Sequence, residues 1–176
     1  MVVTLCNKQR EMAYKDTVAI IGATTTIGTV VARSIAANHR LLLMDAARPE
    51  LVRLQHNIQA ANPKAEVEIL NCCKDASWEA DIIVVANEGN GLDELAFKMK
   101  EVSTCKSVLH FTTNEINIDK LQQMLPHARV VTIALSQPFT GTNANAFIHG
   151  AGKEAIQAAK MIVSAMGCIH QIPEKA

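Results

Sequence analysis

Apolar segments of two kinds alternate along the chain, and this alternation limits the folds that the chain can adopt. Short runs rich in β-branched residues, such as residues 17–22 and 80–87, are typical of strands buried on both faces of a sheet. Segments whose apolar residues recur at helical spacing, such as residues 26–38, lie between these runs. Strands that alternate with helices predict parallel pairing through right-handed crossovers. We therefore predict an α/β chain with a doubly wound, mostly parallel sheet of seven to eight strands.

The predicted elements fill the chain from residue 17 onward. The predicted strands are residues 17–22, 40–45, 65–71, 80–87, 107–112, 128–135, 146–150 and 168–172. The predicted helices are residues 26–38, 49–62, 90–102, 117–125 and 153–167. No internal repeat or low-complexity linker divides them. We therefore predict a single domain over residues 17–176, preceded by an N-terminal extension of residues 1–16.

The balance of charge argues against several classes of partner. Lys plus Arg and Asp plus Glu both total 17, so the formal net charge is zero and gives no general attraction to nucleic acid or anionic membranes. With one Trp, one Tyr and four Phe, the chain has few rings for stacking on single-stranded nucleic acid. No apolar run reaches the ~18 residues of a membrane span. We expect no nucleic-acid or membrane partner, and the weak self-repulsion is compatible with the homodimer that we expect.

The cysteines indicate a reducing compartment and no metal. There are five of them, an odd number at irregular spacing, without a C-x-x-C pair or a Cys/His cluster of zinc spacing. Reduced thiols are typical of cytoplasmic proteins, so we expect a cytoplasmic location and no metal site.

The turn after the first strand reads GATTTIG, residues 22–28. In dinucleotide-binding turns, the first glycine permits the tight turn, the second lets backbone approach the pyrophosphate, and the third lets helix and strand pack closely. Gly22 and Gly28 fill the outer roles, and the middle glycine of a G-x-x-G-x-x-G pattern falls on Thr25. If the turn needs a positive φ there, threonine costs about 1 kcal/mol or more.

The three threonines of the turn also bring hydroxyl groups. Each could hydrogen-bond a phosphate, and one of them could cap the following helix. The predicted pyrophosphate contacts are Gly22, Ala23, Thr24, Thr25, Thr26, Ile27 and Gly28. The alternative is a scaffold of the same fold whose turn is merely capped by threonine.

Asp45 ends the second predicted strand, where such units carry a carboxylate for the adenosine ribose hydroxyls. A 2′-phosphate would meet a like charge there, so Asp45 slightly favours NAD over NADP. Arg48 could reach a 2′-phosphate, and NADP therefore stays open. The alternative role for Asp45 is a cap for the helix that begins near Pro49.

Polar residues follow the later strands, at the edge where open α/β sheets bind their ligands. Asn87 and Glu88 follow the fourth strand, and Thr112 ends the fifth; we predict that these three contact the cofactor. Residues 136–138 follow the sixth strand. The catalytic residues stay unknown from the sequence, and His149 is the first candidate if the reaction needs an acid.

Four blocks of the sequence together resemble a known group of enzymes. They are VAIIGATTTIG, ADIIVVAN, HARVVTIAL and the closing AFIHGAGKEAIQAAKMIVSAMGCIHQIPE. They are similar to successive blocks of the deazaflavin-coenzyme-dependent NADP oxidoreductases and of the N-terminal domains of pyrroline-carboxylate reductases. The resemblance covers about residues 17–173. It implies an NAD(P)-binding Rossmann fold with the phosphate loop at Gly22 to Gly28, and it places Asn87 and Thr112 along the nicotinamide side.

The sequence departs from these families in three places. Thr25 replaces the middle glycine, and Asp45 stands where NADP users typically place small polar and basic residues. The sequence ends at Ala176, without the helices that in many relatives form the substrate side and the dimer.

Two hypotheses of function follow. The first is an NAD(P)-dependent oxidoreductase that transfers a hydride between nicotinamide and an unidentified acceptor, either a small molecule or a flavin or deazaflavin. The alternative is a non-catalytic module that senses the dinucleotide or serves as a scaffold and acts through a protein partner.

Overall fold

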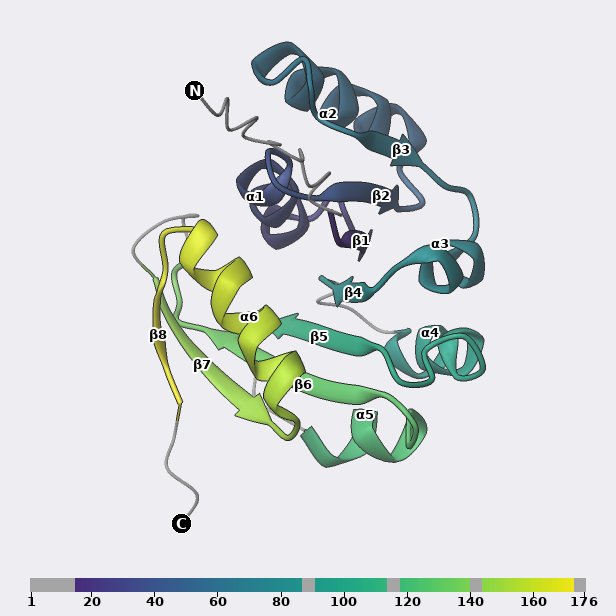
Figure 1. Cartoon of the computed structure of the whole chain (residues 1–176), viewed down its shortest axis with the longest axis vertical. Coiled ribbons are helices and arrows are strands. Elements are labelled where there is room, and N and C mark those ends of the chain that lie inside the picture. Colours follow the sequence, from purple (N-terminus) through teal and green to yellow (C-terminus); the bar gives the residue numbers. More distant parts are fainter. Residues whose placement is uncertain (1–14, 87–90, 114–117, 140–143, 173–176) are drawn as a thin grey trace, which may run out of the picture.

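A sheet of eight strands runs through the molecule, with helices on both of its faces (Figure 1). The computed structural model describes residues 15–86, 91–113, 118–139 and 144–172. The strands are β1 (Thr17–Ile21), β2 (Arg40–Met44), β3 (Val67–Ile69), β4 (Ile82–Val85), β5 (Ser107–Thr112), β6 (Arg129–Leu135), β7 (Asn145–Gly150) and β8 (Ile169–Gln171). The helices are α1 (Thr26–Ile35), α2 (Arg48–Ala61), α3 (Cys73–Glu79), α4 (Leu92–Met99), α5 (Ile118–Met124) and α6 (Lys153–Ala165).

The strand order is β3-β2-β1-β4-β5-β6-β7-β8, and neighbours from β3 to β6 are parallel. Only β7 reverses the direction, pairing antiparallel with β6, and β8 then runs parallel to β7. The order changes direction between β1 and β4, which is the topological switch point of a doubly wound sheet. The predicted fold class is therefore confirmed: this is a Rossmann fold.

The alternation of side chains along each strand divides the core in two. In β1, Val18 and Ile20 pack into a cluster with α1, α2 and α6. Ala19 and Ile21 point the other way and pack into a second cluster with α3, α4 and α5. Because both faces of the strands are covered, their sequences read as continuous apolar runs. Figure 1 shows α3, α4 and α5 together along one side of the sheet.

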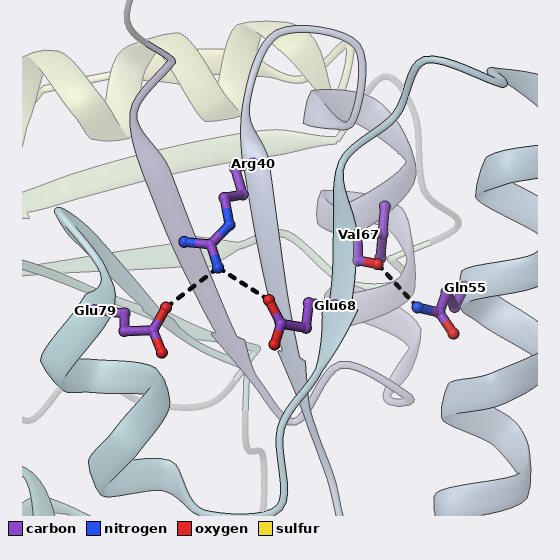
Figure 2. Close-up of polar contacts among 5 residues, drawn as sticks. All are labelled: Arg40, Gln55, Val67, Glu68 and Glu79. Atoms are coloured by element: carbon purple, nitrogen blue, oxygen red, sulfur yellow. Dashed lines mark hydrogen bonds and ion pairs between the residues drawn. The ribbon is translucent and has the colours of Figure 1, made fainter.

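The edge of the sheet at β3 is shorter than predicted and is held by side chains. Of the predicted strand 65–71, only Val67–Ile69 pairs with β2. Figure 2 shows that Gln55 donates to the carbonyl oxygen of Val67 at 2.8 Å, which covers an acceptor of the edge strand. Arg40 bridges Glu68 at 2.9 Å and Glu79 at 3.2 Å, and so links the starts of β2, β3 and the end of α3.

Helix α3 was not predicted. It has seven residues and no side-chain cap at its N-terminus, so its local signal is weak. Its C-terminal end is held by Lys106, which lies just before β5 and whose Nζ donates to the carbonyl oxygens of Ser77 and Trp78. Burial lowers the pKa of Lys106, and the negative charge of Asp81 opposes that effect.

Candidate functional site

Six parallel strands end at one edge of the sheet, and the turn after β1 lies at this edge beside the switch point. Ligands of open α/β sheets bind in the crevice outside these carboxyl ends. The candidate site is therefore built from the turn at residues 22–25, the first turn of α1, the end of β2 and the segments that follow β4, β5 and β6.

Two glycines shape the turn between β1 and α1. Gly22 has a φ of +81°, which glycine adopts without strain. Its N–H and that of Ala23 donate to the carbonyl oxygen of Met44 at 2.9 and 3.2 Å, and so tie the turn to the end of β2. A Cβ on Gly28 would lie 2.1 Å from the carbonyl oxygen of Gly22. Turn and helix therefore lie so close together that only glycine fits at position 28.

Thr25 is the N-cap of α1. Its φ of −64° and ψ of 163° are extended backbone, so the turn does not place the strain there that a positive φ would bring. Its Oγ1 accepts the N–H of Gly28 at 3.0 Å and lies 2.8 and 3.0 Å from the carbonyl oxygens of Gly22 and Ala86. One of the three threonines thus caps the helix, as predicted. Because its single proton is shared between two carbonyls, Thr25 has none to donate to a phosphate.

Replacing Thr25 with valine is expected to lower the free energy of unfolding by about 1–2 kcal/mol, because the N–H of Gly28 loses its cap. Chemical denaturation of the purified protein measures the change. The matched control is Thr26→Val, one residue along, whose exposed hydroxyl has no partner in the described residues; it is expected to change stability by less than about 0.5 kcal/mol. Equal losses at the two positions would contradict the capping role.

Asp45 follows β2 and reaches back to the turn. Its Oδ2 accepts both the N–H of Thr24 at 3.0 Å and the hydroxyl of Thr24 at 2.6 Å. Burial by itself raises the pKa of Asp45, but the hydrogen bonds from Thr24 and from the backbone of Ala47 and Ala46 outweigh it. The pKa therefore lies below its ordinary value of 3.8, and the carboxylate is ionised at neutral pH.

The alternative role of Asp45 as a helix cap is wrong. The N-cap of α2 is Ala47, which makes no side-chain capping hydrogen bond. The contact of Asp45 Oδ1 with the N–H of Ala47 is 3.4 Å, longer than an ordinary hydrogen bond. The strong bonds of Asp45 go instead to the turn between β1 and α1.

Two backbone donors are left at the start of α1. Within the described part of the chain, the N–H groups of Thr26 and Ile27 have no hydrogen-bond partner. Their neighbours are occupied, since Thr24 donates to Asp45 and Gly28 to Thr25. Unpaired N–H groups and the positive end of the helix dipole together favour an anion. The exposed side chain of Thr26 adds a hydroxyl at the same place.

Arg48, predicted as a possible partner of a 2′-phosphate, lies in the first turn of α2. Its guanidinium donates to Oδ1 of Asn71, beyond the end of β3. Two further arginines, Arg33 and Arg53, line a pocket of about 200 Å³ between α1 and α2. The other residues that line this pocket are Thr24, Thr29, Glu50, Leu54 and Asn57.

The segments after β4, β5 and β6 are described only in part. Asn87 and Glu88, two predicted cofactor contacts, lie outside the described residues. Thr112 lies at the end of β5 and is buried, so its side chain offers a ligand little surface. Beyond it, the side-chain amide of Gln137 donates to the carbonyl oxygen of Thr113 at 3.3 Å, which joins the segments that follow β5 and β6.

The connection from β6 to β7 begins and ends at this same edge, because β7 runs antiparallel to β6. Ser136 and Asn145 pair at its base: the N–H of Ser136 donates to the carbonyl oxygen of Asn145 at 2.8 Å. In return, Oγ of Ser136 accepts the N–H of Asn145 at 3.0 Å. These two hydrogen bonds join the end of β6 to the first residue of β7.

His110 and His149 lie on either side of Thr132 in one row across the sheet. The strand register places His110 of β5 beside Thr132 of β6, and Thr132 opposite His149 of β7. The hydroxyl of Thr132 is buried and has no hydrogen-bond partner among the described residues. Burial lowers the pKa of His110, which favours its neutral form. In the described residues, no group of three or more His, Cys, Asp or Glu side chains could hold a metal ion.

Two larger hollows lie elsewhere on the molecule. One of about 740 Å³ opens between α3 and α4, and Cys72, Phe97 and Lys98 are among its lining residues. The other, of about 710 Å³, lies at the amino ends of β1, β4 and β5 under α6. Neither contains a residue that we predict to contact a dinucleotide. Among the helices in the described part of the chain, none combines the length and apolar character that a membrane crossing requires.

Sequence reasoning missed how the turn divides its work. It offered the hydroxyls of Thr24, Thr25 and Thr26 alike to a phosphate. In the structure Thr24 bonds to Asp45, Thr25 caps α1, and Thr26 is the threonine of the three that faces solvent with an unpaired N–H. Their adjacency to Asp45 and Ala86 is a tertiary property and leaves no local signal. One local cue could have identified the cap: Thr25 stands three residues before Gly28, which is the spacing between an N-cap side chain and the backbone N–H that it accepts.

No protein-family model matches the sequence, and no curated protein sequence matches it. Solved structures do match. Pyrroline carboxylate reductase of Plasmodium falciparum with NADP bound aligns with a TM-score of 0.68 at 14% identity, over 90% of this chain and 58% of that one. Prephenate dehydrogenase of A. aeolicus in complex with hydroxyphenyl propionate and NAD+ aligns with a TM-score of 0.70 at 11% identity, over 94% of this chain and 62% of that one.

A protein of Arthrobacter sp. described as an F420-dependent NADP reductase aligns with a TM-score of 0.64 at 17% identity, over 88% of this chain and 84% of that one. The chain thus spans about 58% of the length of the Plasmodium reductase and most of the Arthrobacter protein. At these identities the likeness concerns the fold. The structural neighbours are NAD(P)-dependent oxidoreductases, and the resemblance to pyrroline-carboxylate reductases and deazaflavin-dependent NADP reductases is confirmed at the level of the fold.

Proposed function

We propose that the chain binds a nicotinamide dinucleotide across the carboxyl edge of its sheet and forms the cofactor-binding part of an oxidoreductase. The observation that carries this proposal is the pair of unpaired N–H groups on Thr26 and Ile27. They lie at a turn against which Gly28 of α1 packs closely. An anion at this place would satisfy both donors and the helix dipole. The structural neighbours that hold NADP or NAD+ on the same fold support the proposal.

The residues present fit a dinucleotide. Thr26 and Ile27 would donate their N–H groups to the pyrophosphate, and the exposed hydroxyl of Thr26 would add a third bond. Asp45 would accept the ribose hydroxyls through Oδ1, whose contact with the N–H of Ala47 is long, at 3.4 Å. Thr25 and Gly28 would hold the turn without touching the ligand. Nicotinamide, when bound, supplies or accepts the hydride; the chain binds and orients it.

The hydride acceptor belongs to the proposal as well. A small molecule or a flavin or deazaflavin would approach from the side of β5 and β6, where the segments after these strands are joined through Gln137 and Thr113. The proposal also includes a homodimer, because the formal net charge of zero leaves little self-repulsion between two copies of the chain.

The test removes one backbone donor without disturbing the helix. Proline is well accommodated in the first turn of a helix, and the residue before it favours the extended backbone that Thr25 already has. Thr26→Pro is therefore expected to fold normally and to weaken NADH binding about 10-fold or more, because a charge-assisted hydrogen bond is lost. Calorimetric titration of NADH and NADPH measures this.

Thr26→Ala is the matched control, because it removes the hydroxyl and keeps the N–H. It is expected to weaken binding much less than proline does. A wild-type protein that binds neither dinucleotide at millimolar concentration would refute the proposal, as would equal affinities for the proline variant and the wild type. NADH oxidation followed with a panel of flavins, deazaflavins and carbonyl or imine acceptors then tests turnover; tight binding without turnover would favour the sensing module.

A further inference from the structure

The bond between Thr24 and Asp45 joins the turn after β1 to the end of β2, across 21 residues of sequence. At 2.6 Å, the bond from the Thr24 hydroxyl to Oδ2 of Asp45 is the shortest hydrogen bond among the described residues of the turn. The N–H of Thr24 donates to the same oxygen at 3.0 Å. We propose that Thr24 is a positioning residue: its hydroxyl holds Asp45 so that Oδ1 is left for the ribose hydroxyls, and it thereby sets a preference for NAD(H) over NADP(H). This inference rests on the proposed function.

The two oxygens of Asp45 are used unequally. Oδ2 receives two donors from Thr24, whereas the hydrogen bond that Oδ1 accepts within the described residues is a long one, 3.4 Å from the N–H of Ala47. A carboxylate offers about four lone-pair sites. The capacity that remains is therefore concentrated on Oδ1, and rotation of the carboxylate would cost both bonds to Thr24.

The charge of Asp45 is not neutralised locally. In the described residues it forms no ion pair, and the guanidinium of Arg48, three residues along the chain, donates to Asn71. A 2′-phosphate next to a fixed, ionised carboxylate meets a like charge, whereas ribose hydroxyls find an acceptor. Holding Asp45 in place thus favours the unphosphorylated ribose in two ways.

The inference changes the role that the sequence suggests for Thr24. Its hydroxyl donates its single proton to Asp45 and has none for a phosphate. An effect of Thr24 on binding should consequently depend on the ribose, and it should be visible as a difference between NADH and NADPH rather than as an equal loss for both.

The experiment compares Thr24→Val with Thr24→Ser by calorimetric titration of NADH and NADPH. The wild type is expected to prefer NADH. Valine keeps the shape of threonine but removes the hydroxyl, so it is expected to reduce the ratio of the NADPH Kd to the NADH Kd about 10-fold. Serine retains the hydroxyl and is expected to keep the wild-type ratio within about 3-fold.

The matched control is Thr29→Val. Thr29 is also half-buried in the same segment, but its hydroxyl donates to the carbonyl oxygen of Ala23 at 3.2 Å and not to Asp45. Its replacement removes one hydrogen bond of the same chemical kind and is expected to leave the NADPH-to-NADH ratio unchanged. A change as large as that of Thr24→Val would show a general effect of loosening the turn.

The dependence of NADH binding on pH supplies a readout that a purely structural role would not move. Because the hydroxyl of Thr24 helps to lower the pKa of Asp45, its removal raises that pKa relative to the wild type. As the pH is lowered, NADH affinity should therefore begin to fall at a higher pH in Thr24→Val than in the wild type or in Thr24→Ser.

The outcomes separate the inference from the proposed function. If the wild type binds neither dinucleotide, the proposed function fails. If the wild type binds but prefers NADPH, or if Thr24→Val leaves both the ratio and the pH profile unchanged, the positioning role is overturned and dinucleotide binding stands. Should the valine variant not fold, Thr24→Ala, compared with Thr24→Ser, decides by the same ratio.

Discussion

Gly28→Ala is expected to lower the free energy of unfolding by about 3 kcal/mol or more and to abolish dinucleotide binding. The added Cβ would lie 2.1 Å from the carbonyl oxygen of Gly22 and 2.9 Å from Cα of Ala23. Both are backbone atoms of the turn, and the turn is itself tied to Met44, so α1 has to move away. The better helix propensity of alanine, about 1 kcal/mol, is too small to offset this. Chemical denaturation and NADH titration measure the two effects.

Gly152→Ala separates this steric conflict from the general cost of replacing a glycine. Gly152 has a φ of +98°, but the nearest atom to an added Cβ is 3.6 Å away. Its replacement is expected to cost about 1–2 kcal/mol through backbone strain and to leave dinucleotide binding intact. A smaller loss for Gly28→Ala than for Gly152→Ala would contradict the tight contact between turn and helix.

Phe111→Ala is expected to lower the free energy of unfolding by about 3–5 kcal/mol, and Phe97→Ala by less than about 0.5 kcal/mol. Phe111 of β5 is fully buried among the residues that pack against α1, α2 and α6, so its truncation leaves a cavity. Phe97 of α4 is 77% exposed and loses little on truncation. Because the chemical change is the same and propensity differences are at most about 1 kcal/mol, burial accounts for most of the difference between the two.

Denaturation midpoints of the two phenylalanine variants, measured under one condition, check this expectation. Similar losses would mean that the side chain of Phe97 is buried in the protein in solution, and they would contradict its exposed position on α4. A small loss for Phe111→Ala would contradict the packing of β5.

The strands and the outer glycines could be predicted because their signals are local. A strand buried on both faces needs a continuous apolar run, and this held for β1 and β4. Gly22 and Gly28 stand where a tight turn and a close contact require glycine, and both have that geometry. Asp45 could be predicted to lie at the carboxyl edge of the sheet because it directly follows the apolar run of β2.

The features that could not be predicted depend on contacts between residues far apart in the sequence. The three threonines of the turn are chemically identical, and their roles are decided by Asp45 and by Ala86, which lies 61 residues from Thr25. The seven-residue α3 depends on Lys106, 28 residues from Trp78. A local pattern contains neither fact. The sequence likewise did not show that β3 would shorten to the three residues that pair with β2.

The paired base of the β6–β7 connection has an evolutionary consequence. Ser136 and Asn145 bond to each other in both directions, so the base of the connection is held by their own hydrogen bonds. Phe139 and Ala144 pack on the core, and the N–H of Ile169 in β8 donates to the carbonyl oxygen of Ala144. Insertions and deletions between Phe139 and Ala144 can therefore accumulate at little cost to the strands. Since the connection stands at the carboxyl edge, such length changes would alter the rim of the candidate site while the scaffold that positions Asp45 and α1 is inherited unchanged.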